Sequence, residues 1–260
     1  MSADRARKLL DDIAGQYGQL LGTNLIGVYE HGSLSFGCFT WKVSDIDFLV
    51  VVRREPGQQE KEEMIRLLMD RLPDAPEKGF EMSVICGRHL RPFVYPTPFS
   101  LHYSNAHLEA CRADISGYCR SMNGEDKDLA AHCMVTKEKG RRVRGAEIDE
   151  VFGEVPRKDY LDSILGDVEN ACGEIEENPV YVSLNLCRVL AAIEEDAVLS
   201  KDEGGRWGLQ RLDDQWKGFI HKALNAYSGG AAMKTDPDEA RRFAGHMLER
   251  INKAVSIKHI

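Results

Sequence analysis

The stretch that decides the fold runs from Ile26 to Arg53 and reads IGVYEHGSLSFGCFTWKVSDIDFLVVVR. It places Gly32-Ser33 at the end of one apolar run and Asp45 and Asp47 at the head of another. Residues two apart on a strand point to the same face, so the two carboxylates are expected side by side. The run Phe48–Val52 that follows them predicts a buried strand.

These residue types indicate nucleotide chemistry. Mg²⁺ prefers oxygen ligands and commonly takes one or two protein carboxylates together with substrate phosphates. A Gly-Ser turn that enters a helix offers backbone N–H groups to a phosphate. Taken separately, Gly32-Ser33 is interpreted as an ordinary strand-to-helix turn, and the Asp pair as a loop cap. Together, with Ser33 twelve positions before Asp45, they resemble the signature of the nucleotidyltransferase superfamily whose core resembles DNA polymerase β.

Length and composition favour two globular domains and exclude several classes of protein. The chain has 260 residues, of which 43% are hydrophobic, and its 34 Lys and Arg are outnumbered by 42 Asp and Glu. An acidic chain is not built to hold a nucleic-acid backbone, so no nucleic-acid partner is expected. The run from Lys137 to Arg144 is either a local basic patch or a solvated turn. The seven cysteines lack CxxC spacing, so neither a disulfide framework nor a zinc site is predicted.

The expected setting is a reducing cytoplasm. The N-terminus reads as an amphipathic helix rather than a leader, and no apolar run approaches the roughly 20 residues that span a bilayer. We expect a soluble cytoplasmic protein, a monomer or weak oligomer, with no membrane partner.

The pattern predicts an α+β chain of two unlike halves. Residues 1–156 are predicted to form a nucleotidyltransferase domain with a mixed sheet and helices, and residues 157–260 an all-α helical bundle. The first half is expected to contain strands at 25–31, 45–53 and 80–85, helices at 4–21, 58–71 and 126–139, a helix start or turn at 33–38, an extended Pro-rich connection at 91–99, and a loop through Val155-Pro156. The second is expected to contain helices at 159–175, 179–194, 201–210, 214–227 and 236–255.

Glu81 is a candidate third carboxylate. It begins the alternating strand Glu81–Ile85, and in a sheet that also carries Asp45 and Asp47 it is expected beside them. Its role is either that of a third metal ligand or that of the base that takes a proton from an acceptor hydroxyl. The alternative is a solvated strand residue.

The motif, together with the runs Leu184–Arg188 and Lys201–Trp207, resembles the aminoglycoside (3'')(9) adenylyltransferases over roughly residues 20 to 228. The resemblance implies that Arg188 and Lys201, thirteen residues apart, hold the nucleotide triphosphate from the helical domain. The other positions that it assigns are phosphate, metal, base and adenine contacts at Ser33, Ser44, Asp45, Asp47, Glu81 and Tyr227. Gly32 is expected to cradle the β- and γ-phosphates together with Ser33. Without the resemblance, Arg188 reads as an interhelical salt bridge and Lys201 as a capping or solvated lysine.

The chain departs from the family at the acceptor positions. Family members that modify streptomycin carry a Trp and Asp residues at the start of the second domain and another Trp in the first. Here the second-domain segment is Glu174–Tyr181, with Asn178 in place of an acid, and the segment Ser100–His107 lacks the aromatic residue. An acidic cleft built from Glu174, Glu176, Glu177 and Glu81 suits a polycationic acceptor, whereas an exposed acidic helix end is the plainer explanation.

The predicted function is Mg²⁺-dependent transfer of AMP from ATP to a hydroxyl of a small molecule. The resemblance implies an aminoglycoside or aminocyclitol antibiotic such as spectinomycin or streptomycin, with the site between the domains. Two alternatives stay open: the same chemistry with a protein side chain or a nucleotide as acceptor, and a nucleotide-binding sensor without transfer activity. Three like charges held together favour a metal site over a sensor, because their repulsion is costly without a cation.

Overall fold

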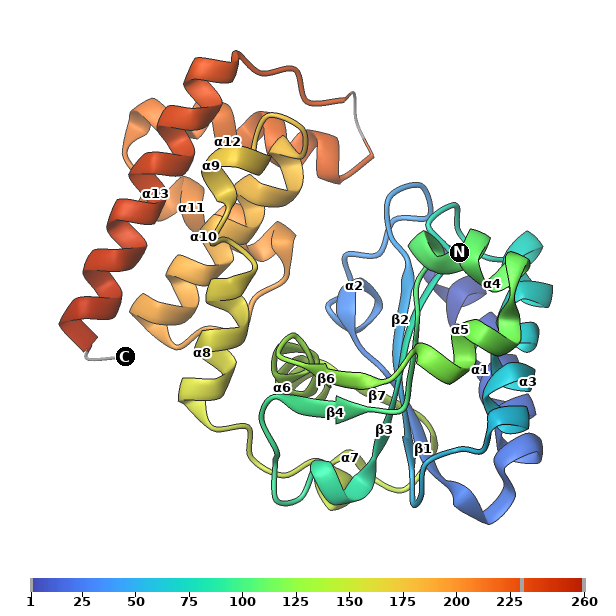
Figure 1. Cartoon of the computed structure of the whole chain (residues 1–260). Helices are drawn as coiled ribbons and strands as arrows, with labels where there is room; N and C mark the ends of the chain where they lie inside the picture. The colour runs from blue at the N-terminus through green and yellow to red at the C-terminus, as the bar shows by residue number, and fades with distance from the viewer. Residues whose placement is uncertain (1, 230–231, 259–260) are drawn as a thin grey trace. The chain divides into compact units, whose positions relative to one another are not determined.

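The computed structural model describes residues 2–229 and 232–258 (Figure 1). The chain forms two compact units, Met1–Asp159 and Tyr160–Ile260. The limits predicted from the sequence, 1–156 and 157–260, concern functional domains and stay a prediction. Over the part of the chain that is described, no helix is both long and apolar enough to cross a membrane.

A five-stranded mixed sheet of order β5-β3-β2-β1-β7 forms the frame of the N-terminal unit. Only β2 and β3 pair in parallel, and they do so in unbroken register from Ile46 opposite Phe80 to Val52 opposite Cys86. The other neighbours are antiparallel. The strands are β1 Leu25–Glu30, β2 Ile46–Val52, β3 Phe80–Cys86, β5 Leu101–Tyr103 and β7 Arg141–Gly145.

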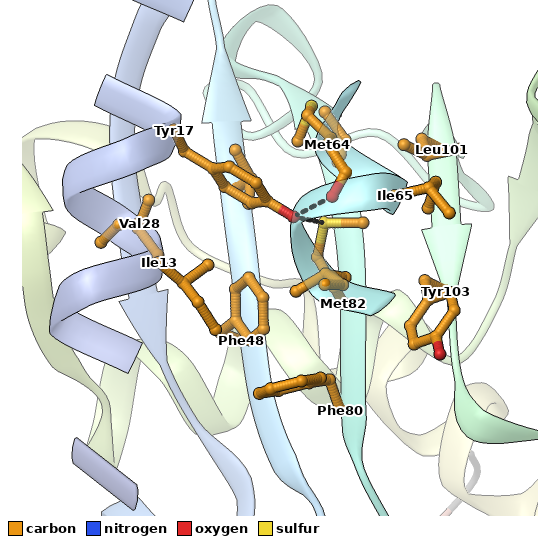
Figure 2. Packing of buried hydrophobic residues seen from close by; sticks show 14 of the residues in the cluster. Ile13, Tyr17, Val28, Phe48, Met64, Ile65, Phe80, Met82, Leu101 and Tyr103 are labelled. Carbon is orange, nitrogen blue, oxygen red and sulfur yellow. Dashed lines mark hydrogen bonds between the residues drawn. The ribbon is translucent and has the colours of Figure 1, made fainter. Parts of the chain in front are cut away.

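The hydrophobic core lies between one face of this sheet and helices α1 (Ser2–Leu21) and α3 (Gln58–Arg71). Phe48 and Met82 point into it, and the Tyr17 hydroxyl of α1 donates a hydrogen bond to the carbonyl oxygen of Met64 in α3 at 3.0 Å (Figure 2). Burying each large apolar side chain contributes about 1.5–3 kcal/mol. Because side chains alternate along a strand, the neighbours of Phe48 and Met82 face the opposite side of the sheet, where α6 (Leu129–Lys139) and α2 (Gly32–Ser35) lie.

Two sequence expectations about extended segments are wrong. The end of the Pro-rich segment is not an irregular connection, because Thr97–Phe99 forms β4 and pairs with β6 (Gly124–Asp126). Pro98 is tolerated there because a two-stranded ribbon has free edges. The run Lys137–Arg144 is not a solvated turn: α6 ends at Lys139 and β7 follows, with Val143 packed against the core. The alternative of a local basic patch stays a prediction.

Several short helices were not predicted, since they carry too few residues for a visible period. They are η1 Gly22–Asn24, η2 Leu72–Asp74, η3 Gly87–His89, η4 Asn105–His107, α4 Leu108–Ala113, α5 Ile115–Ser121 and α7 Ile148–Val151.

The C-terminal unit is helical, and within residues 160–229 and 232–258 it contains no strand. Its helices are α8 Arg157–Gly166, α9 Ala171–Glu174, α10 Pro179–Glu195, α11 Lys201–Arg211, α12 Asp214–Tyr227 and α13 Pro237–Lys258. The predicted α+β class, a mixed sheet with helices followed by an all-α unit, is therefore confirmed. The glycine pair Gly229-Gly230 follows α12; Gly229 has φ 89°, and Gly230 lies outside the described residues.

One helix prediction in this unit is wrong, because 159–175 is broken between α8 and α9. Gly166 ends α8, as expected of a residue with low helix propensity. Asp167, just beyond it, bonds Arg188 of α10 instead of continuing the helix.

Helix α10 packs against α11, α12 and α13 and buries most of its surface. Its approach to α11 is close because α11 presents glycines. A Cβ at Gly204 would fall 2.8 Å from the Cβ of Arg188, and one at Gly208 would fall 2.8 Å from the Sγ of Cys187. This packing fixes the start of α11 against α10.

Candidate active site

Three carboxylates meet where the neighbouring interior strands β2 and β3 begin. Asp47 and Glu81 are register partners on β2 and β3, and Asp45 directly precedes β2. One oxygen from each of the three lies within 4.8 Å of the other two. The residues fit Mg²⁺, which takes oxygen ligands and offsets the repulsion among like charges. The structure thus brings together the three residues that the sequence singled out, while their roles stay a prediction.

The Gly32-Ser33 turn is packed directly on Asp47. Gly32 has φ 62°, and a Cβ there would fall 1.9 Å from Oδ2 of Asp47, so no other residue fits without displacing that carboxylate. The N–H of His31 donates to the backbone oxygen of Asp47 at 3.1 Å. The Oγ of Ser33 is buried and has no hydrogen-bond partner among the described residues. A buried hydroxyl of this kind suits a ligand oxygen.

Ser44 holds the loop that leads into the carboxylates. Its side chain is buried, its Oγ accepts a hydrogen bond from the N–H of Thr40 at 3.1 Å, and its own N–H donates to the Thr40 carbonyl oxygen at 2.9 Å. A hydroxyl that accepts one bond still carries a proton to donate. The Ser44 hydroxyl can therefore still donate to a phosphate oxygen, and this predicted contact stays a prediction.

Histidines that the sequence reasoning missed surround the triad. His31, which is 3% exposed, stacks on His132 of α6 with ring centroids 4.8 Å apart, and Nε2 of His132 lies 3.9 Å from Oε1 of Glu81. Burial and, second, the neighbouring imidazole hold the pKa of His31 well below its ordinary value. On the same face as Glu81, Ser83 Oγ and His102 Nδ1 are hydrogen bonded at 2.9 Å. Burial lowers the pKa of His102 to about 4. His31 sits beside the motif and was findable, whereas no local pattern marks His132.

An ion network around the buried Glu30 supports the same turn. Glu30, fully buried at the end of β1, accepts from Nη2 of Arg7 at 3.1 Å and from Nε of Arg141 at 2.8 Å. Nη2 of Arg7 also donates to the carbonyl oxygen of Leu34 in α2 at 3.0 Å. The network joins α1, β1, β7 and α2, and so it restrains the turn from behind. Sequence reasoning did not find it, because its members are far apart in the chain.

The remaining predicted residues lie in the C-terminal unit. Nη2 of Arg188 of α10 bonds Oδ2 of Asp167, in the turn after α8, at 3.0 Å. Arg188 is therefore in a salt bridge, as the alternative expected, but its partner lies outside a helix. Its Nε is buried and has no partner among the described residues. Lys201 opens α11 after the capping residue Ser200, and its Nζ lies 4.9 Å from the ring centroid of Tyr181. Tyr227 is the last residue of α12.

The residues considered for the acceptor are only partly consistent with an acidic cleft. Glu174 ends α9, and Glu176 pairs with Arg241 of α13. That contact neutralises part of the charge of the acidic segment, and a role of the segment toward an acceptor stays a prediction. Tyr181 is unusual in being an exposed aromatic residue, with 43% of its surface accessible.

Comparison with known proteins shows which families and proteins this chain is similar to. Residues 150–250 match the family described as aminoglycoside adenylyltransferase, C-terminal domain. The chain is 23% identical over 253 residues to an aminoglycoside (3'') (9) adenylyltransferase of Klebsiella pneumoniae, covering 95% of each. It is 26% identical over 216 residues to a spectinomycin 9-adenylyltransferase of Enterococcus faecalis, covering 80% of this chain and 82% of that one.

The fold has a solved counterpart. The crystal structure of the Enterococcus spectinomycin adenyltransferase AAD(9), with ATP and spectinomycin, matches with a TM-score of 0.80 at 21% identity, covering 94% of this chain and 98% of that one. A mixed sheet that carries the carboxylate triad, followed by a helical unit and matched by these relatives, defines an enzyme of the nucleotidyltransferase class. More narrowly, the chain is similar to the aminoglycoside (3'')(9) adenylyltransferases over most of its length, and the resemblance predicted from the sequence is confirmed.

Proposed function

We propose that this protein transfers AMP from ATP, with Mg²⁺, to a hydroxyl of an aminoglycoside or aminocyclitol antibiotic. The observation that carries the proposal is the clustering of Asp45, Asp47 and Glu81 within 4.8 Å, against a turn that fits only glycine. The names of the relatives support the adenylyl group and the class of acceptor.

Asp45 and Asp47 are the proposed metal ligands, and Glu81 is either a third ligand or the base. Bound Mg²⁺ supplies charge neutralisation and a fixed orientation for the triphosphate. The chain contributes the geometry: the β2–β3 register sets the separation of the Asp47 and Glu81 side chains, and Gly32 lets the turn lie against Asp47. The β2–β3 register and the Gly32 turn both belong to the folded chain itself.

The proposed phosphate contacts come from both units. Backbone N–H groups at Gly32 and Ser33, with the unpartnered Ser33 Oγ, face the β- and γ-phosphates, and Ser44 assists. From the C-terminal unit, Arg188 and Lys201 are proposed to approach the triphosphate. Separately, Tyr227 is proposed to lie beside the adenine. Arg188 and Lys201 each offset negative charge of the triphosphate, which the three carboxylates repel. Arg188 exchanges or shares its bond to Asp167 when it binds phosphate.

The chemical step follows from these positions. The acceptor oxygen attacks the α-phosphorus of ATP and forms a new P–O bond, while the bond from the α-phosphorus to the bridging oxygen of pyrophosphate breaks. The proton of the acceptor hydroxyl passes to the Glu81 carboxylate. A positioned base of this kind contributes roughly 10²–10⁴ in rate.

The proposal is tested by following pyrophosphate release with ATP and Mg²⁺ across a panel that contains spectinomycin, streptomycin, a nucleotide and a peptide carrying hydroxyl side chains. We expect release with an antibiotic, and none from the Asp47→Asn variant. Release with the nucleotide or peptide alone supports the first alternative. Tight ATP binding without release for any acceptor supports the sensor and overturns transfer.

A further inference from the structure

One side chain that the proposed mechanism does not use faces its base. Nε2 of His132 lies 3.9 Å from Oε1 of Glu81, and the two side chains are 23% and 31% exposed. Among the described residues, His132 is the basic side chain that lies within ion-pair distance of the Glu81 carboxylate. The separation is too long for a hydrogen bond. A small rotation of either side chain would bring the two atoms within hydrogen-bond distance, and a water molecule can also bridge them.

His132 is held in place from behind. The ring of His31 stacks on it at 4.8 Å between centroids with 35° between planes, and His31 is itself 3% exposed. The backbone of His132 is fixed within α6, where its carbonyl oxygen also accepts from the Thr136 hydroxyl at 2.8 Å. A ring restrained in this way loses little freedom when it forms a bond.

The neighbouring imidazole is already occupied. His102 bonds Ser83, two residues beyond Glu81 on the same face of β3, through Nδ1 at 2.9 Å. Glu81, in contrast, accepts no direct hydrogen bond from any described residue. A flexible and partly exposed carboxylate that must meet a hydroxyl within hydrogen-bond reach gains most from one fixed donor.

We propose that His132 is a positioning residue for Glu81. Its Nε2–H bonds Oε1 when metal and nucleotide are bound, which leaves Oε2 directed at the acceptor hydroxyl. A neutral imidazole has one N–H, so the interaction requires no added proton. The inference rests on the proposed function, in which Glu81 acts on the acceptor.

The kinetic test compares His132→Leu with His132→Gln in the full chain. Leu removes the donor at similar size, whereas the amide of Gln retains one. We expect His132→Leu to lower kcat roughly tenfold, the effect of one ordinary hydrogen bond, with the ATP dissociation constant and Tm nearly unchanged. His132→Gln should recover most of the loss, and His132→Leu should have little further effect in the Glu81→Gln background. An unchanged kcat, or equal losses with and without Glu81, overturns the inference.

A second measurement separates this inference from the proposed function, because it needs no turnover. In ¹⁵N-labelled protein with Mg²⁺ and a non-hydrolysable ATP analogue, the Nε2–H signal of His132 should exchange slowly with solvent. The same signal should shift and exchange faster in Glu81→Gln. Identical signals in both proteins overturn the positioning role. If the signals differ but no acceptor reacts, the contact stands and the proposed transfer fails.

Discussion

Replacing Gly32 by alanine should have two separable effects. The first is the cost of placing alanine at a positive φ, and the second is displacement of the Asp47 carboxylate. Gly32 has φ 62°, and an added Cβ would fall 1.9 Å from Oδ2, 2.5 Å from Cγ and 2.9 Å from Cβ of Asp47. All three distances are shorter than any tolerated contact. Since Asp47 is only 9% exposed, its side chain has little space into which to move.

Gly37 offers a matched control in the same loop region. It has φ 74°, and a Cβ there meets nothing within 4 Å. Gly37→Ala therefore carries only the cost of a left-handed alanine, about 1–2 kcal/mol. Gly32→Ala carries that cost and about 1–3 kcal/mol of overpacking as well. We expect the free energy of unfolding to fall by about 2–5 kcal/mol in Gly32→Ala and by about 1–2 kcal/mol in Gly37→Ala.

The functional consequence follows from the displaced carboxylate. Urea denaturation gives the two stabilities, and calorimetry with ATP and Mg²⁺ gives the two affinities. Gly32→Ala should bind ATP with Mg²⁺ at least about tenfold more weakly than Gly37→Ala, which corresponds to about 1.4 kcal/mol. Equal losses of stability together with equal affinities would refute the claim that Gly32 is selected by its contact with Asp47.

Four further outcomes are expected. Asp47→Asn should abolish transfer, to below about a tenth of wild-type activity, while circular dichroism reports an intact fold. Glu81→Gln should lower turnover by roughly 10²–10⁴ with ATP affinity nearly unchanged in calorimetry, whereas a collapse of affinity would make Glu81 a metal ligand. Lys201→Ala should weaken ATP binding about ten- to hundredfold with little change in Tm, and the exposed-lysine control Lys217→Ala should not. Because the folded-state pKa of His102 is lowered to about 4 from 6.5, the unfolded chain binds the extra proton as pH falls from 6.5 to 4. Stability should decrease across that window by about 1–2 kcal/mol after allowance for partial exposure, and less in His102→Gln by denaturation at each pH.

The fold was predictable where periodicity is strong over many residues. The helix expected at 58–71 begins and ends as predicted, and the strands that carry Asp47 and Glu81 differ by one or two residues at their ends. The break in segment 159–175 has a local signal in Gly166, but the bond between Asp167 and Arg188 that accompanies it joins positions far apart in the chain and was not predictable. Tertiary contacts of this kind override local propensity.

The candidate site divides in the same way. The carboxylates were found because strand alternation and a neighbouring strand determine their positions. His132 and the Glu30 network were missed, since His132 of α6 and Arg141 of β7 are far in the chain from the residues that they contact. A sequence pattern reports which residues share a face, and it does not report which distant helix covers that face.

Catalysis depends on the alignment of β2 with β3, because these parallel strands carry Asp47 and Glu81. Seven consecutive residues of each strand are paired, and Asp47 stands opposite Glu81. A slip of β3 by one residue would turn Glu81 to the other face and bring the apolar Phe80 or Met82 opposite Asp47. Such a misaligned chain would keep its far-ultraviolet signal yet lack one acid of the triad. The specific activity of a refolded sample would then measure the fraction of molecules that joined these strands in the native alignment.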